Sequence, residues 1–199
     1  MQPLEQPALT LAGADLRYLP DWLPAAAADA LLVQLKLSLP WSQHRVRLFG
    51  RELPSPRLSA WIGDPGASYR YSGVVHSPLP WTAELSALRE QLQQTVGCPF
   101  NSVLVNRYRD GQDSMGWHAD DEPELGPEPV IASISLGATR TLHFRARHGD
   151  AKLALDLAHG SLLLMSGTTQ QQYLHAIHKS RRPLGERINL TFRQIATLS

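Results

Sequence analysis

The chain has 199 residues, of which 43% are hydrophobic and 19% are charged, and its formal net charge is only +1. This composition excludes a disordered chain and a broadly basic one, so attraction for an anionic partner has to come from local clusters. The single cysteine, Cys98, excludes an internal disulfide and is typical of a reducing cytoplasm. The N-terminal stretch MQPLEQPALTLAG does not resemble a signal peptide, and no run reaches the roughly 18 apolar residues of a membrane span. We therefore expect a soluble, cytoplasmic protein that does not enter a membrane.

Two helices are expected in the first half of the chain, after an irregular lead-in with one short strand. The segment DWLPAAAADALLVQLKL, residues 21–37, is rich in helix formers, with Asp21 as the expected N-cap and Pro40 as the stop. The segment WTAELSALREQLQQTVG, residues 81–97, repeats leucines on one face and ends at a glycine. Between these helices the chain is rich in proline, glycine and aromatic residues and contains short strand-like pieces.

The character of the sequence changes after Phe100. Short β-rich runs, many of them alternating, are separated by Gly, Asp, Pro and His; they are NSVLVNRYR, VIASISLG, RTLHFRAR, KLALDL, GSLLLM and RINLTFRQI. Several short strands in series, with no helical period of similar strength among them, indicate an antiparallel sandwich or barrel. The predicted fold class is α+β, mainly β: a double-stranded β-helix, or jelly roll, with N-terminal supporting helices.

The stretch GWHADDEPE holds a candidate metal site. His118 and Asp120 are separated by one residue, and on an extended segment two such side chains point to the same side. On its own such a pair is more often solvated surface. His175 offers a third ligand, with His178 as its competitor. Two histidines and one carboxylate leave open positions and suit a non-haem Fe(II) oxygenase, whereas zinc prefers a closed tetrahedral set or three ligands plus water.

The segment RINLTFR places two kinds of side chain on its two faces. Ile188, Leu190 and Phe192 share one face, and Arg187, Asn189, Thr191 and Arg193 share the other. Two arginines that face into a barrel are costly without an anion between them. Either the polar face is wet, or it lines a cavity for a dicarboxylate, which arginine is suited to bind.

Taken together, these segments resemble the AlkB family of Fe(II)- and 2-oxoglutarate-dependent dealkylating dioxygenases, most closely the branch that repairs alkylated DNA in animals. The resemblance covers most of residues 45–195 and is carried by VLVNRYRDGQDSMGWHADDE, PVIASISLGATRTLHFR, HGSLLLM, YLHAI and RINLTFR. It implies Fe(II), 2-oxoglutarate and O2 as cofactor and co-substrates, with alkylated DNA as the partner. The implied reaction demethylates 1-methyladenine and 3-methylcytosine and yields succinate, CO2 and formaldehyde.

The resemblance also implies a role for each site residue. His118, Asp120 and His175 would bind the iron, because the family's spacing to RINLTFR favours His175 over His178. Arg187 would form a salt bridge with the distal carboxylate of 2-oxoglutarate. The remaining co-substrate contacts implied are Asn106, Tyr108, Thr191 and Arg193.

Substrate contacts are implied on three segments. Asp121 would contact the damaged base and favour a cationic lesion over a neutral base, with Glu122 beside it. Phe49 would be the tip of a hairpin that fills the gap left by a flipped base. The other implied contacts are Gly50 and Arg51 on that hairpin, and Tyr69, Arg70 and Tyr71 in a nucleotide-recognition segment. Basic clusters in HRVRLFGR and HKSRRPLGER would neutralise phosphates or be ordinary surface. Trp117 is expected to pack under the GWHADDEPE motif and to fix how the chain enters it.

We expect one domain over residues 1–199 and, by default, a monomer. An N-terminal extension and helix would occupy residues 1–40, the nucleotide-recognition segment 41–80, and the jelly-roll core 100–195. Two rival hypotheses remain: the same chemistry on RNA or protein, and a non-enzymatic β-sandwich that binds Ca2+ through the acidic loop. A duplex wedge has no purpose on a protein substrate, and paired arginines on one strand argue against the Ca2+ module.

Overall fold

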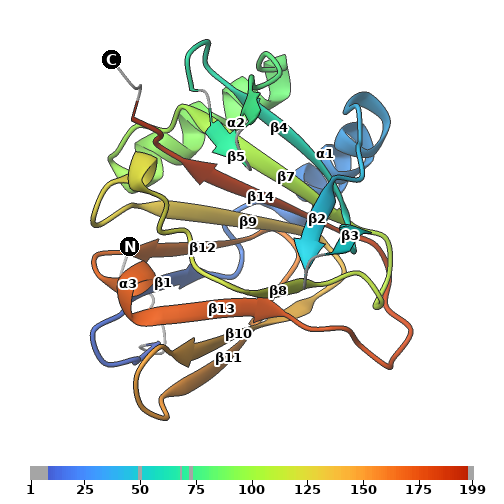
Figure 1. The fold of residues 1–199 in the computed structure, drawn as a ribbon. Coiled ribbons are helices and arrows are strands. Elements are labelled where there is room, and N and C mark those ends of the chain that lie inside the picture. The colour runs from blue at the N-terminus through green and yellow to red at the C-terminus, as the bar shows by residue number, and fades with distance from the viewer. Residues whose placement is uncertain (1–8, 49–50, 68, 72–73, 197–199) are drawn as a thin grey trace, which may run out of the picture.

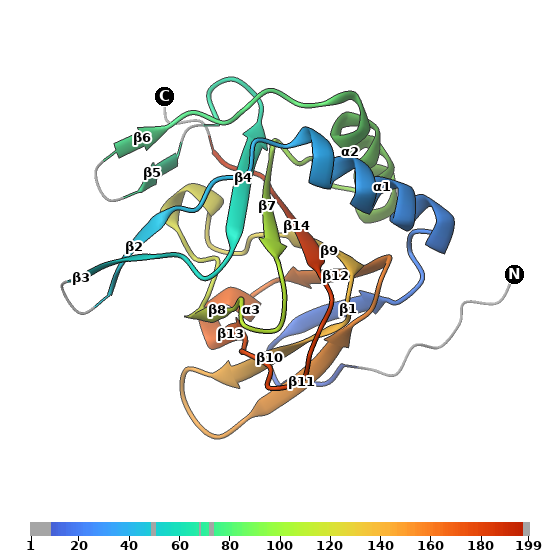
Figure 2. The same cartoon turned by 90° about the vertical axis from the view of Figure 1, so that its right-hand side faces the viewer.

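The structure is a computed structural model that describes residues 9–48, 51–67, 69–71 and 74–196. Two β-sheets lie face to face, and two longer helices cover the outer side of the larger sheet (Figures 1 and 2). The six-stranded sheet has the order β1 (Asp15–Leu19), β12 (Ser161–Ser166), β9 (Ile131–Gly137), β14 (Arg187–Arg193), β7 (Ser102–Tyr108) and β4 (Leu58–Gly63). The four-stranded sheet has the order β11 (Lys152–Leu157), β10 (Arg140–Ala146), β13 (Tyr173–Ile177) and β8 (Met115–His118).

Every pairing between neighbouring strands of these two sheets is antiparallel, which confirms the mainly β jelly-roll prediction. The six runs predicted as strands correspond to β7, β9, β10, β11, β12 and β14. Two short hairpins, β2 (Arg45–Leu48) with β3 (Arg51–Pro54) and β5 (Tyr69–Tyr71) with β6 (Val74–His76), project from the sandwich (Figure 2). The sequence patterns did not identify β8 and β13 as strands, although these two carry predicted metal ligands.

The two longer helices differ in how they begin. Helix α2 (Ala83–Val96) starts as its sequence predicts, with the Thr82 hydroxyl accepting a hydrogen bond from a backbone N–H of the first turn, and it ends at Gly97. Helix α1 (Ala25–Ser38) has Pro24 at the N-cap, so the prediction that Asp21 caps it is wrong. The chain before α1 is held instead by a hydrogen bond from the Leu23 N–H to a carbonyl beside β12. Two single turns, α3 (Thr169–Gln172) and the 3-10 helix η1 (Pro123–Leu125), complete the described helices.

Two apolar clusters lie on opposite faces of the six-stranded sheet. The first packs α1 and α2 against the outer face of the sheet and includes Ile188, Leu190 and Phe192 of β14. The second lies between the two sheets and includes Phe144 and Ile177. Strand β14 is therefore buried on both sides, and its polar face is not wet. No helix in the described part of the chain is long and apolar enough to cross a membrane.

Candidate metal centre and co-substrate site

Three residues predicted as metal ligands lie together at one edge of the four-stranded sheet. His118 ends β8 and His175 lies directly opposite it on β13, with 4.2 Å between the ring centroids. Asp120 follows two residues after His118 and is 3% exposed. One ligand atom from each residue lies within 4.8 Å of the others, and this is the one such group of three among the described residues. A short antiparallel pair thus brings together side chains that are far apart in the sequence.

Hydrogen bonds orient the ligands. The Nδ1 atom of His118 lies 2.9 Å from the Gly116 carbonyl oxygen, so a proton on Nδ1 donates there and leaves Nε2 for a metal. The backbone N–H of Asp120 donates to the Gln170 side chain of α3 at 3.0 Å. Its Oδ1 atom accepts a hydrogen bond from Nη2 of Arg193 at 2.7 Å. These two hydrogen bonds hold Asp120 in place from its backbone and from its carboxylate.

The protonation states also suit a metal. Burial would raise the pKa of the Asp120 carboxyl, but the neighbouring Arg193, and then His175 and His118, lower it to about 2. Burial, and then the neighbouring His118, lowers the pKa of His175 to about 3. The carboxylate is thus ionised and this imidazole neutral near pH 7, which are the forms that bind a divalent cation.

Arg187, at the start of β14, is 1% exposed and lies between the sheets. Its Nη2 atom donates to the Ser135 hydroxyl at 2.9 Å and to the Asn189 side chain at 2.6 Å. Among the described residues, its Nε and Nη1 atoms have no hydrogen-bond partner and no carboxylate pairs with it. Burial lowers the pKa of Arg187 to about 10, so it remains a cation near pH 7. A buried cation with two unused donors fits an anionic ligand.

The other predicted co-substrate residues surround this cation. Tyr108 ends β7, and the guanidinium of Arg187 lies 5.2 Å from the centroid of its ring. Thr191 accepts a hydrogen bond from the Asn189 amide at 2.8 Å. Asn106 lies opposite Asn189 across the β7–β14 pair. The five residues predicted to bind 2-oxoglutarate therefore share the inner face of β7 and β14.

Several polar residues at this site were not predicted. Ser133 and Ser135 of β9 bond to the Arg187–Asn189 network. Their signal was present, because VIASISLG places two small polar residues at alternate positions of an apolar run. Arg57 donates to the Asn106 side chain at 2.9 Å; its segment gave no such signal.

Arg140 was also missed. It is 3% exposed and donates to the backbone carbonyls of Asp110, Asp113 and His178 at 2.7 to 3.1 Å. Its guanidinium lies 5.6 Å from the ring centroid of Tyr108. This arginine ties the β7–β8 connection to the segment that follows β13. The sequence did contain a signal, because Arg140 stands at the same alternate positions of RTLHFRAR as the inward-facing Leu142 and Phe144.

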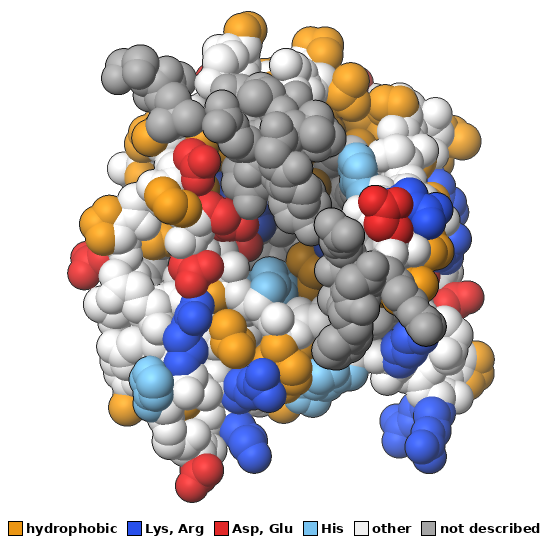
Figure 3. All heavy atoms as spheres, in the orientation of Figure 1, with side chains coloured by type: hydrophobic (Ala, Val, Ile, Leu, Met, Phe, Trp, Pro, Cys, Tyr) orange, Lys and Arg blue, Asp and Glu red, His pale blue; other side chains and the backbone are white. Residues whose placement is uncertain are grey.

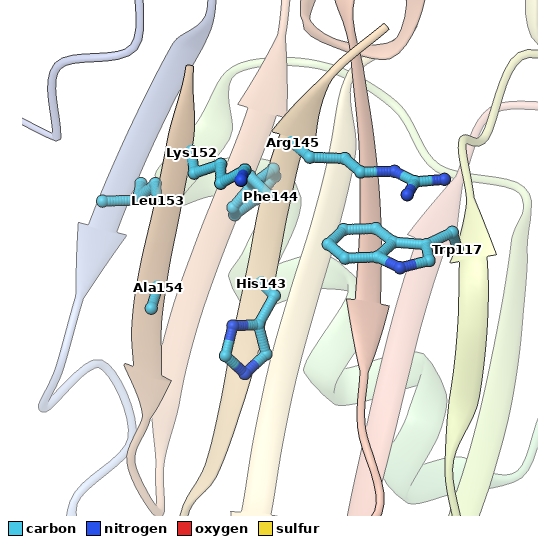
Figure 4. A pocket seen from close by; sticks show the side chains of 7 residues that line it. All are labelled: Trp117, His143, Phe144, Arg145, Lys152, Leu153 and Ala154. Atoms are coloured by element: carbon cyan, nitrogen blue, oxygen red, sulfur yellow. The ribbon is translucent and has the colours of Figure 1, made fainter. Parts of the chain in front are cut away.

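Trp117 lies on the face of β8 opposite the metal ligands, and His178, which follows β13, packs against its ring. The Trp117 ring packs against the guanidinium of Arg145, 4.4 Å from the ring centroid, and against His178 at 5.1 Å. It lines a shallow pocket of about 390 Å³ on the outer face of the four-stranded sheet (Figure 4). Trp117 therefore packs on the face of β8 opposite His118, because neighbouring side chains on a strand point to opposite faces. The same geometry places His178 outside the ligand group.

The predicted substrate residues belong to three segments of the chain. Asp121 is half-exposed and forms an ion pair with Arg147, and Glu122 precedes η1. Acidic side chains gather on the side of the face where the β8–β9 connection runs (Figures 1 and 3). Arg51 begins β3, and β5 contains Tyr69, Arg70 and Tyr71, whose side chains are outside the description. Phe49 and Gly50 lie outside the described residues, and all of these base contacts stay predictions.

The fold and the centre define a class. A jelly roll with two histidines and one carboxylate at the edge of one sheet, and a buried arginine on a strand of the other sheet, is the arrangement of a 2-oxoglutarate-dependent iron oxygenase. A model of the 2OG-Fe(II) oxygenase superfamily matches residues 15–193. The rat protein named alpha-ketoglutarate-dependent dioxygenase alkB homolog 3 is 40% identical over 186 residues, which are 88% of this chain and 62% of the relative. The mouse DNA oxidative demethylase ALKBH2 is 39% identical over 181 residues, covering 85% of this chain and 76% of the relative.

The chain therefore belongs to the 2OG-Fe(II) oxygenase superfamily and, within it, to the AlkB family. It spans about three fifths of the length of the rat relative. A solved structure titled "The structure of OsALKBH1" matches 90% of this chain and 97% of that chain with a TM-score of 0.61 at 18% identity, which shows the same fold. The superfamily uses Fe(II), 2-oxoglutarate and O2, so the cofactor prediction is confirmed.

Proposed function

We propose that the protein removes methyl groups from N-alkylated bases of DNA, such as 1-methyladenine and 3-methylcytosine, and so repairs them by direct reversal. The reaction is coupled to decarboxylation of 2-oxoglutarate to succinate and CO2 and releases formaldehyde. The observation that carries the proposal is the buried Arg187, with its unused donors, on the strand whose Arg193 bonds to Asp120 of the three-ligand group His118, Asp120 and His175. Relatives named DNA oxidative demethylase support the DNA substrate.

Each group of residues has one task in this scheme. Bound iron and 2-oxoglutarate supply the oxidising chemistry, and the protein orients and shields it. Arg187 holds the distal carboxylate of 2-oxoglutarate and so fixes the orientation of the co-substrate. Asp120 and the two histidines hold the ion and leave its remaining positions for the co-substrate and dioxygen. The inner face of β7 and β14 excludes water around both.

Base selection falls to the segment after β8. 1-Methyladenine and 3-methylcytosine are cations, so the carboxylate of Asp121, next to a metal ligand, favours them over the neutral parent bases. A base inside a duplex has to be extruded first, and this costs less for a lesion that cannot pair. We assign the extrusion to the β2–β3 hairpin, with Phe49 as the wedge, and the base pocket to Tyr69 and Tyr71.

Phosphate contacts complete the proposed interface. Lys179, Arg181 and Arg182 are exposed on the segment between β13 and β14. Arg45, on the β2–β3 hairpin, forms an ion pair with Glu52. Neutralisation of phosphates by such residues gives binding that depends on salt and not on sequence. We also propose that residues 1–199 act as one catalytic domain, as a monomer inside the cell.

Demethylation in a defined mixture tests the function. The protein is purified anaerobically with Fe(II) and incubated with 2-oxoglutarate, O2 and an oligonucleotide that carries one 1-methyladenine, as a single strand or a duplex. Mass spectrometry follows the loss of the methyl group, and succinate is measured alongside. We expect demethylation that requires both iron and 2-oxoglutarate.

Two other outcomes reject parts of the proposal. Succinate without demethylation keeps the oxygenase and rejects the DNA base as substrate, and a matched RNA oligonucleotide then tests the nearest rival. Neither product from folded, iron-loaded protein rejects the enzyme. The Ca2+-binding module would then be the remaining hypothesis, although two of the three grouped ligands are histidines, which Ca2+ disfavours.

A further inference from the structure

Asp121 contacts a basic side chain that comes from the C-terminal end of strand β10. Arg147 directly follows β10 and donates from Nη2 to Oδ2 of Asp121 and to the Gln170 carbonyl oxygen at 3.2 Å. Its backbone N–H donates to the Gln172 carbonyl oxygen at 2.8 Å. Arg147 is therefore fixed to α3 at two points, and its guanidinium is directed at the carboxylate assigned to the damaged base.

The same short helix holds the metal ligand next to Asp121. The side chain of Gln170 accepts the backbone N–H of Asp120, and its backbone carbonyl accepts Arg147. Helix α3 thus holds Asp120 directly and Asp121 through Arg147. These hydrogen bonds set the position of the ion pair relative to the metal ligand Asp120.

The pair has no net charge, and it is open to water. The side chain of Asp121 is 49% exposed and that of Arg147 is 32% exposed. An ion pair in this setting contributes little to folding stability. A base placed over it would remove that water, and the balance of charge beneath the base would then matter much more.

We propose that Arg147 determines which lesions the enzyme accepts: by neutralising Asp121, it allows neutral N-alkylated bases to bind beside this carboxylate as well as cationic ones. The inference rests on the proposed function, in which the damaged base lies against Asp121. A cationic base brings its own counter-charge to the carboxylate. A neutral base does not, and without Arg147 it would cover an unpaired anion, which is costly.

The two contacts to Asp121 are compatible. A carboxylate accepts several hydrogen bonds at once. Asp121 can therefore keep Arg147 at Oδ2 while it accepts a hydrogen bond from a base. The role of Arg147 is that of a positioning and charge-balancing residue, because it acts on the base through Asp121.

The test compares two single-stranded oligonucleotides that differ only in the lesion, cationic 1-methyladenine or neutral 3-methylthymine. We expect Arg147→Gln to lower kcat/KM for the neutral lesion about 10-fold more than for the cationic one, as an unpaired charge beneath the base would predict. Arg147→Lys keeps a cation and should restore most of the wild-type ratio. In an Asp121→Asn background, Arg147→Gln should no longer change the ratio.

Arg145→Gln is the matched control. It removes the same charge two residues earlier, at a side chain on β10 that packs on Trp117. We expect it to change both lesions by the same factor. The inference would be overturned if the ratio of kcat/KM for the two lesions were the same in Arg147→Gln as in the wild type, or shifted towards the neutral lesion. A wild-type protein that binds no neutral lesion would overturn it too.

Equilibrium binding separates this inference from the proposed function. Fluorescence anisotropy of the two labelled oligonucleotides gives the same selectivity ratio without iron or turnover. If Arg147→Gln changes the ratio of the two affinities although no demethylation occurs, the role of Arg147 is upheld and only the proposed reaction is rejected. Demethylation with a ratio that ignores Arg147 upholds the reaction and rejects the inference.

Discussion

The co-substrate side and the base side of the proposed active site are built differently. Arg187 and its partners lie on β7, β9 and β14 of the six-stranded sheet, where antiparallel neighbours hold each strand on both sides. Asp121 and Arg147 lie just outside strands and are partly exposed. Rigid strands suit a co-substrate that never changes, while connections can vary without disturbing the core. The difference indicates that chemistry and substrate choice can be altered separately.

The first prediction removes the centre that both sides share. His175→Ala should abolish iron binding and turnover, because only two of the three ligands whose atoms lie within 4.8 Å of one another would remain. The fold should survive, as followed by circular dichroism, while iron content and demethylation are measured. His178→Ala, the neighbouring alternative, should leave the iron content unchanged. Turnover retained by His175→Ala would remove His175 from the ligand set.

The second prediction breaks only the co-substrate side. Arg187→Met should raise the KM for 2-oxoglutarate by at least about 30-fold, which corresponds to about 2 kcal/mol for a buried charge pair cut on one side. Methionine fills similar space and removes a buried charge, so the protein should stay folded. Affinity for an oligonucleotide, measured by anisotropy, should not change. A KM that rises only two- or three-fold would place the carboxylate elsewhere.

The third prediction addresses only the base side. Phe49→Ala should lower kcat/KM on duplex DNA by roughly 10-fold, since base–aromatic stacking contributes about 1–3 kcal/mol per base. Repair of the same lesion in a single strand should change little, because no partner strand needs to be held open. Both substrates are compared under one set of conditions with a single preparation. Equal losses on both would show that Phe49 is not a wedge.

The fourth prediction concerns the stability of the iron-free protein. The pKa of His175 falls from 6.5 to about 3 on folding, mainly through burial. Below pH 6.5 the unfolded chain therefore binds a proton that the folded chain does not, and stability falls as the pH is lowered towards 3. The slope is on the order of 1 kcal/mol per pH unit. Denaturant unfolding at several pH values should show a shallower dependence for His175→Gln; identical slopes would contradict the shift.

The sequence predicted the strands of the six-stranded sheet better than those that carry the ligands. VIASISLG and RINLTFR have long apolar or alternating runs, and both became central strands. MGWH and YLHAI are short and hold polar or small residues at buried positions, so no period marked them as β8 and β13. Helix α3 has four residues, TQQQ, without an apolar stripe, and its role appears only through its contacts.

By itself the sequence determined the fold class, the family and the need for Fe(II), 2-oxoglutarate and O2, because periodic patterns and short motifs are local. It also placed Arg187, Asn189 and Thr191 on one face of a strand. The tertiary structure alone decided what that face meets. The bond from Arg187 to Ser135 spans 52 positions of the chain, and the bond from Asp120 to Gln170 spans 50. A period of two fixes the direction of a side chain but not its partner, since the partner depends on strand order and register.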